Sequence, residues 1–170
     1  CAVLDCRRRF SNDQPQYSEV KVMMELKNKN LSVIGLGQTG VAVANFLSRK
    51  GACVTVTDGK SREQLLEPLK QLCPDVKTCF QNPEPPSDTE VVVLSPGVDI
   101  YSSFLESASS RGIEIISEIE LANRFNTVPI IAITGTNGKS TCTSLIAEIF
   151  SQAGKIVHAG GNLGTPFISL

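Results

Sequence analysis

Apolar residues occur along the chain in two patterns that alternate with each other. Short apolar runs, typical of buried strands, stand at 31–34, 52–57, 76–80, 90–94, 113–116, 130–133 and 156–159. In the longer stretches between most of them, apolar residues recur every three or four positions, as on one face of a helix. These stretches are 41–50, 61–72, 102–111, 117–125 and the residues before Gly154. Strands that alternate with helices predict an α/β fold built on a parallel sheet.

The apolar run at 130–133 leads into a glycine-bounded turn, T-G-T-N-G-K-S-T, and a helical pattern follows at once. This order is typical of a phosphate loop, in which backbone amides of the turn and the helix start face an anion. Lys139 would place its charge on the phosphate oxygens, and Ser140 or Thr141 would offer a hydroxyl to Mg²⁺. The full Walker pattern needs glycine where Ile133 stands. The alternative is therefore a glycine turn with a solvated lysine.

A second glycine-rich turn, G-L-G-Q-T-G, spans residues 35–40 between the first strand and the first helix. Asp58 follows 18 residues after the third glycine, at the end of the next strand, where an acid suits a ribose hydroxyl pair or a base N–H. The pattern indicates a nucleotide diphosphate without identifying the nucleotide. Two alternatives remain: an NAD(P)-binding oxidoreductase domain, or a tight turn without a ligand in which Asp58 merely caps.

Two further turns have simpler interpretations. Ser95-Pro96-Gly97 ends the strand at 90–94, at the edge where open α/β sheets place ligands, although a plain turn would also explain it. Ser117 and Glu120 have the spacing of a capping box, so Glu118 and Glu120 are interpreted as structural rather than catalytic. His158 lies within a predicted strand and receives no role.

Composition narrows the class of protein. The net charge of −1 favours neither nucleic acid nor an anionic membrane surface, and no apolar run is long enough to span a bilayer. None of the six cysteines forms C-x-x-C, which favours reduced, buried thiols in a cytosolic protein.

The 170 residues divide into three predicted parts. Residues 1–28 show no sustained period, and we expect a disordered or extraneous extension. Residues 29–126 are predicted to form a Rossmann-like domain around the first glycine turn. Residues 127–170 are too few to close a core around a phosphate loop, so we expect the truncated start of an ATP-binding domain.

Taken together and in order, these motifs resemble the Mur ligases. The resemblance rests on G-L-G-Q-T-G at 35–40, S-P-G at 95–97, E-I-E-L at 118–121, G-T-N-G-K-S-T at 135–141 and G-G-N-L-G-T-P at 160–166. It covers residues from about 24 to 170. The first two motifs resemble most the member of the family that adds D-glutamate.

The resemblance implies roles for individual residues. The first domain would bind the UDP part of a substrate rather than NAD, and the second would bind ATP. The implied UDP-substrate-binding residues are Gln38, Thr39, Asp58, Gly59, Lys60, Gly97 and Asn162. The implied ATP-binding residues are Gly135, Thr136, Asn137, Gly138, Lys139, Ser140 and Thr141. Lys139 would be the catalytic cation and Ser140 a ligand of Mg²⁺.

The implied reaction is ATP-driven amide formation between UDP-N-acetylmuramoyl-L-alanine and D-glutamate, through an acyl phosphate. The protein would be a cytoplasmic monomer, and residues beyond Leu170 would complete the site. Two other functions stay open beside the oxidoreductase: another Mur or folylpolyglutamate-type ligase, and a nucleotide-gated regulatory module without ligase chemistry.

Overall fold

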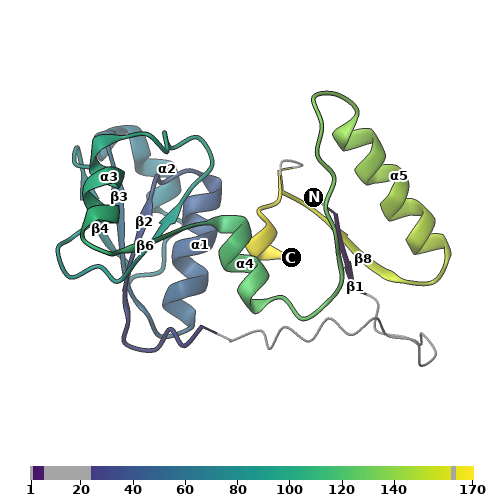
Figure 1. Ribbon diagram of the computed structural model, residues 1–170, viewed down its shortest axis with the longest axis horizontal. Coiled ribbons are helices and arrows are strands. Elements are labelled where there is room, and N and C mark those ends of the chain that lie inside the picture. The colour runs from purple at the N-terminus through teal and green to yellow at the C-terminus, as the bar shows by residue number, and fades with distance from the viewer. Residues whose placement is uncertain (1, 6–23, 162–163) are drawn as a thin grey trace. The chain divides into compact units, whose positions relative to one another are not determined.

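The computed structural model describes residues 2–5, 24–161 and 164–170 (Figure 1). The chain divides into two compact units. The first comprises Met24–Asn123, and the second comprises Arg124–Leu170 together with strand β1 (Ala2–Asp5).

The first unit is built on a five-stranded sheet in which every neighbouring pair is parallel. Its strands are β2 (Asn30–Ile34), β3 (Cys53–Asp58), β4 (Lys77–Phe80), β5 (Val91–Leu94) and β6 (Glu114–Ser117). Their order across the sheet is β4-β3-β2-β5-β6. The chain moves outward from β2 to β4 and then returns to the other side of β2. The strand order therefore reverses between β2 and β5, which is where open α/β sheets bind ligands. The predicted α/β, Rossmann-like fold class is confirmed.

The helical segments of this unit occupy the predicted intervals between strands. They are α1 (Gln38–Arg49), the 3₁₀ turn η1 (Glu63–Leu65), α2 (Leu66–Leu69), α3 (Ser103–Ser110) and α4 (Glu118–Phe125), whose last two residues belong to the second unit. Val43, Ala44 and Leu47 are fully buried on α1, which packs against β2 and β3. The strands contribute Val33, Val56 and the Val92–Val93 pair to the same core, each with no exposed surface. Continuous apolar strands of this kind are typical of a parallel sheet that is covered on both faces.

The single helix predicted over 61–72 is wrong. The structure has a 3₁₀ turn followed by a four-residue helix, and it buries Leu65 while Leu66 is 52% exposed. Pro68 explains the break, because proline has no amide hydrogen and is tolerated only in the first turn of a helix. The helix that contains it therefore begins at Leu66.

The capping box at the start of α4 is confirmed in its N-cap half. The Ser117 hydroxyl oxygen accepts a hydrogen bond from the Glu120 amide at 3.2 Å. Glu118, in the first turn, is only 4% exposed.

The second unit contains β7 (Ile130–Ile131), α5 (Lys139–Gln152), β8 (Ile156–Ala159) and the 3₁₀ turn η2 (Phe167–Ser169). Its sheet has the order β7-β1-β8, and β1 is antiparallel to both neighbours. The predicted strand at 130–133 is shortened to two residues. Among the described helices, none combines the length and the apolar character that crossing a membrane requires.

The predicted buried face of α5 is only partly buried. Leu145 is 60% exposed and Ile149 is 55% exposed, whereas the residue of α5 that is fully covered is Thr143. The helix packs against β8 and β1, and these short strands cover too little of its surface.

The thiols of Cys53 and Cys142 are exposed rather than buried, although the four described cysteines are free, as predicted.

The expected extension over 1–28 differs from the structure at both ends. Ala2–Asp5 is strand β1, because its backbone pairs with β7 and β8. Leu26 is 4% exposed, and the Asn28 amide donates to the Gly51 carbonyl at 2.9 Å, so this segment packs onto the first unit. Residues 6–23 lie outside the described part of the chain.

Candidate functional site

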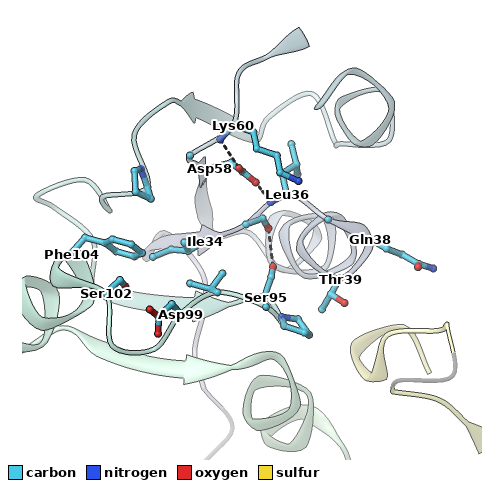
Figure 2. A pocket seen from close by; sticks show the side chains of 17 residues that line it. Ile34, Leu36, Gln38, Thr39, Asp58, Lys60, Ser95, Asp99, Ser102 and Phe104 are labelled. Carbon is cyan, nitrogen blue, oxygen red and sulfur yellow. Dashed lines mark hydrogen bonds between the residues drawn. The ribbon is translucent and has the colours of Figure 1, made fainter. Parts of the chain in front are cut away.

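A pocket of about 460 Å³ lies at the carboxyl ends of β2, β3 and β5 (Figure 2). Six of the seven residues implied for UDP-substrate binding line it: Gln38, Thr39, Asp58, Gly59, Lys60 and Gly97. The seventh, Asn162, lies outside the described residues. Three separate loops therefore bring the implied residues to one place. The volume of the pocket lies in the range of about 300–1,000 Å³ that is usual for small-molecule sites.

The glycine turn forms one wall of this pocket through close backbone contact. A Cβ atom on Gly40 would lie 2.0 Å from the Gly35 carbonyl oxygen and 2.9 Å from the Ser95 hydroxyl, so only glycine fits there. Gly35 has a φ of +92°, which other residues rarely adopt. The Ser95 hydroxyl donates to the Gly35 carbonyl at 2.8 Å and joins the loop after β5 to the turn.

The start of α1 belongs to the same wall. Gly37 is its N-cap and supplies no side-chain cap to the first turn, while Gln38 and Thr39 line the pocket. The amides of a helix start, together with the positive end of the helix dipole, favour a bound anion such as a diphosphate. The Lys60 side chain adds a positive charge from the loop after β3.

Asp58 connects two of the pocket's loops. One carboxylate oxygen, Oδ2, accepts a hydrogen bond from the Leu36 amide at 2.7 Å. The other, Oδ1, accepts one from the Lys60 amide at 2.8 Å. Figure 2 shows the carboxylate between these two backbone groups. The residue that we expected at a ribose or a base thus also holds the glycine turn and the loop after β3 together.

Sequence reasoning missed part of the opposite wall. Pro83, Ser102 and Phe104 also line the pocket, and they come from loops and a helix start that no motif marks. Within the described residues, the buried Ser102 hydroxyl has no hydrogen-bond partner. The Ser-Pro-Gly turn was a usable signal for this wall, because it marks where β5 ends.

The second candidate site, the phosphate loop, has the backbone that its sequence predicts. Gly135 and Gly138 have φ values of +150° and +76°, and Gly138 is the N-cap of α5 without a side-chain cap. The Lys139 ammonium donates to the Gly135 carbonyl at 2.6 Å and to the Thr136 carbonyl at 3.3 Å. The lysine therefore lies over its own loop, at the place where an anion on the helix start would meet it.

The donor groups at the loop fit Mg²⁺ bound together with a polyphosphate. Ser140 and Thr141 lie exposed in the first turn of α5, and their hydroxyl oxygens are the hard ligands that this ion prefers. In the described residues there is no group of three or more histidine, cysteine, aspartate or glutamate side chains that could hold a metal ion.

The chain resembles proteins of one family. Residues 29–117 match the family model described as Mur ligase MurD-like, N-terminal domain. A UDP-N-acetylmuramoylalanine–D-glutamate ligase of Geobacter metallireducens is 49% identical over 150 residues, which cover 86% of this chain. The enzyme of the same name from Caldanaerobacter subterraneus subsp. tengcongensis is 45% identical over 148 residues, or 85% of the chain.

The chain spans 33% of the length of each of these two relatives. Among solved structures, a pseudomurein peptide ligase type C from Methanothermus fervidus is 22% identical. That alignment covers 75% of this chain and 27% of the other, with a TM-score of 0.43.

Proposed function

Because this chain belongs to the MurD-like Mur ligases, we propose that it carries the UDP-substrate pocket and the ATP phosphate loop of a ligase. The ligase would join D-glutamate to UDP-N-acetylmuramoyl-L-alanine. The observation that carries the proposal is the pocket at the carboxyl ends of β2, β3 and β5, where six of the residues implied by the resemblance meet. On this proposal, residues 29–126 form the UDP-substrate domain and residues 127–170 begin the ATP-binding domain.

The pocket supplies what a UDP group needs. The diphosphate would lie against the start of α1, where Gln38 and Thr39 line the pocket. The uracil end would lie toward Asp58, Gly59 and Lys60, and Gly97 would close the opposite side. Asn162 is proposed to hydrogen-bond the sugar substrate near its reacting end.

The phosphate loop, Gly135–Thr141, would bind ATP. Backbone amides of Thr136, Asn137 and Gly138 would surround the phosphates. The Lys139 ammonium would move from the two loop carbonyls that it now bonds to the phosphate oxygens. Mg²⁺, held by the Ser140 hydroxyl and the phosphates, would neutralise charge on the transferring phosphoryl group. Thr141 would support the loop.

The reaction follows from the weakness of a carboxylate as an electrophile. An oxygen of the alanyl carboxylate attacks the γ-phosphorus of ATP, the bond to the β-phosphate oxygen breaks, and ADP leaves. The amine of D-glutamate then attacks the acyl carbon, loses a proton and expels inorganic phosphate, so that an amide remains. Negative charge builds on the transferring phosphoryl group, and Lys139 would stabilise it. The D-glutamate site is assigned to no residue of this chain.

Both substrates are water-soluble, and we place the reaction in the cytoplasm, with the protein acting as a monomer. The fold alone would also suit an NAD(P)-binding oxidoreductase, because both classes use a glycine turn at the same sheet edge.

A calorimetric titration separates the two functions. We expect the chain to bind UDP-N-acetylmuramoyl-L-alanine saturably and NADH not at all. Lys60→Ala should weaken UDP binding, because it removes the cation of the pocket, whereas Lys77→Ala, on β4 outside the pocket, is the matched control. Binding of NADH without binding of the UDP compound would contradict the proposal.

A further inference from the structure

We infer that Asp58 is a positioning residue for the diphosphate, because it fixes the glycine turn and the loop after β3 in one arrangement. The inference deepens the proposed function and rests on it. It gives Asp58 a task that the residue's place at a nucleotide pocket does not by itself imply. An acid at the end of the second strand of such a domain is ordinarily expected to accept hydrogen bonds from the ligand's ribose.

The hydrogen bonds of the carboxylate carry the inference. Its two oxygens accept from the Leu36 and Lys60 amides at 2.7 and 2.8 Å, distances typical of charge-assisted bonds. Leu36 lies between the first two glycines of the turn, two residues before α1 begins. Lys60 lies two residues after Asp58 and carries the pocket's positive charge. One side chain thus sets both the entry to α1 and the path of the loop that holds the cation.

The rest of the turn is fixed by independent contacts. The Gly35 amide donates to the Thr57 carbonyl at 2.8 Å, and the Gly35 carbonyl accepts from the Ser95 hydroxyl. The bond from the Leu36 amide to Asp58 adds to the two contacts of Gly35. It fixes Leu36, which lies between Gly35 and the start of α1. Without it, the amides that begin α1 would lose their fixed orientation toward the pocket.

The direction in which pyrophosphate binding changes when Asp58 loses its charge distinguishes a positioning role from the other possible roles of this residue. A carboxylate beside an anion site repels the anion, so removal of its charge should tighten the binding of inorganic pyrophosphate. Loss of a positioning bond should have the opposite effect, because the turn then has to be ordered each time that an anion binds. A residue that touches only the nucleoside should leave pyrophosphate binding unchanged.

Asp58→Asn is the test variant. Its side-chain amide keeps one acceptor oxygen and replaces the other with a donor, so one of the two backbone amides loses its bond. Asp99→Asn is the matched control, because Asp99 lines the same pocket and its carboxylate accepts a hydrogen bond from the Tyr101 amide within its own loop. Asp58→Glu keeps the charge and both acceptor oxygens on a longer side chain. It is the second test variant and replaces Asp58→Asn if that variant does not fold.

The measurement is the Kd of the 170-residue chain for UDP and for inorganic pyrophosphate, by calorimetry. We expect Asp58→Asn to weaken both ligands by about tenfold or more, the loss that one charge-assisted hydrogen bond accounts for. Asp58→Glu should give a smaller loss, and Asp99→Asn should leave pyrophosphate binding unchanged or tighter. In the ligand-free protein, Asp58→Asn should also raise hydrogen exchange at the Leu36 or the Lys60 amide, with exchange in β5 unchanged.

Two results would overturn the inference alone. One is pyrophosphate binding that stays equal or becomes tighter in Asp58→Asn while UDP binding weakens, which would make Asp58 a direct nucleoside contact. The other is unchanged exchange at both amides. If the wild-type chain binds neither UDP nor pyrophosphate, the proposed function fails first, and the inference fails with it.

Discussion

At the scale of single residues, Gly40 shows how tightly the turn at the pocket is built. Its α-carbon lies so close to the Gly35 carbonyl that an added Cβ would approach that oxygen to 2.0 Å. The Gly35 carbonyl is a backbone group, so it cannot rotate away from an added Cβ as the end of a flexible side chain could. The contact joins the start of α1 to the end of β2 and so fixes the wall on which we place the diphosphate.

Gly40→Ala should therefore lower the free energy of unfolding by about 1–3 kcal/mol, the usual cost of overpacking a closed site. Urea denaturation followed by circular dichroism measures this change. Gly37→Ala is the control, because nothing lies within 4 Å of its Cβ position and its φ of −92° suits any residue. We expect it to change stability by less than about 0.5 kcal/mol. Equal losses in the two variants would contradict the close approach.

Lys139 is the second residue with a specific prediction. In the complete ligase that we propose, Lys139→Ala should lower ATP-dependent phosphate release by about 100-fold or more, since it removes a charge that stabilises the transferring phosphoryl group. Steady-state assays with both substrates would measure this. Lys155→Ala, just after the other end of α5, is the control and should retain activity. Normal turnover in Lys139→Ala would remove the lysine from the mechanism.

At the scale of elements, prediction succeeded where a local signal decided the structure. The Ser-x-x-Glu spacing placed the start of α4. Prediction failed where tertiary packing decided. Leu66 continues the apolar period of the sequence, but Pro68 shortened the helix, and Leu66 is exposed. Likewise, the apolar period of α5 did not predict how much of that helix its own unit covers.

The N-cap of α4 offers a test at this scale. Ser117→Ala removes the acceptor for the Glu120 amide and should destabilise the first unit by about 1 kcal/mol. Ser110→Ala is the comparison, because that hydroxyl only donates to the Ser107 carbonyl at the end of α3. Its effect should stay within about 0.5 kcal/mol. Thermal denaturation of the two variants side by side would show whether the cap contributes.

At the scale of the molecule, the described lining of the proposed UDP pocket comes entirely from the first unit, between Ile34 and Phe104. The sequence predicted which turns would meet, because the carboxyl ends of parallel strands share one edge. A capping role for Asp58 was one of the alternatives, and its bond to the Lys60 amide, two residues later in the chain, is such a cap. The sequence did not predict the second bond, to the Leu36 amide, because that contact depends on how two loops pack.

The excised segment Met24–Asn123 should therefore fold and bind UDP with a Kd within about twofold of that of the whole chain, a difference far below 1 kcal/mol. Calorimetric titration of both proteins with UDP would measure the two Kd values. A folded segment that does not bind would show that residues outside this unit contribute to the pocket.

The hydrogen bond from Ser95 to the Gly35 carbonyl joins loops that are 60 residues apart in sequence. A ligand in the pocket would touch both loops only in the native state, so it would act as a reversible crosslink on the folded chain. At a UDP concentration of one hundred times its Kd, linkage adds about 2.7 kcal/mol to the free energy of unfolding. Melting temperature alone would then rank candidate inhibitors of this pocket, without any turnover assay.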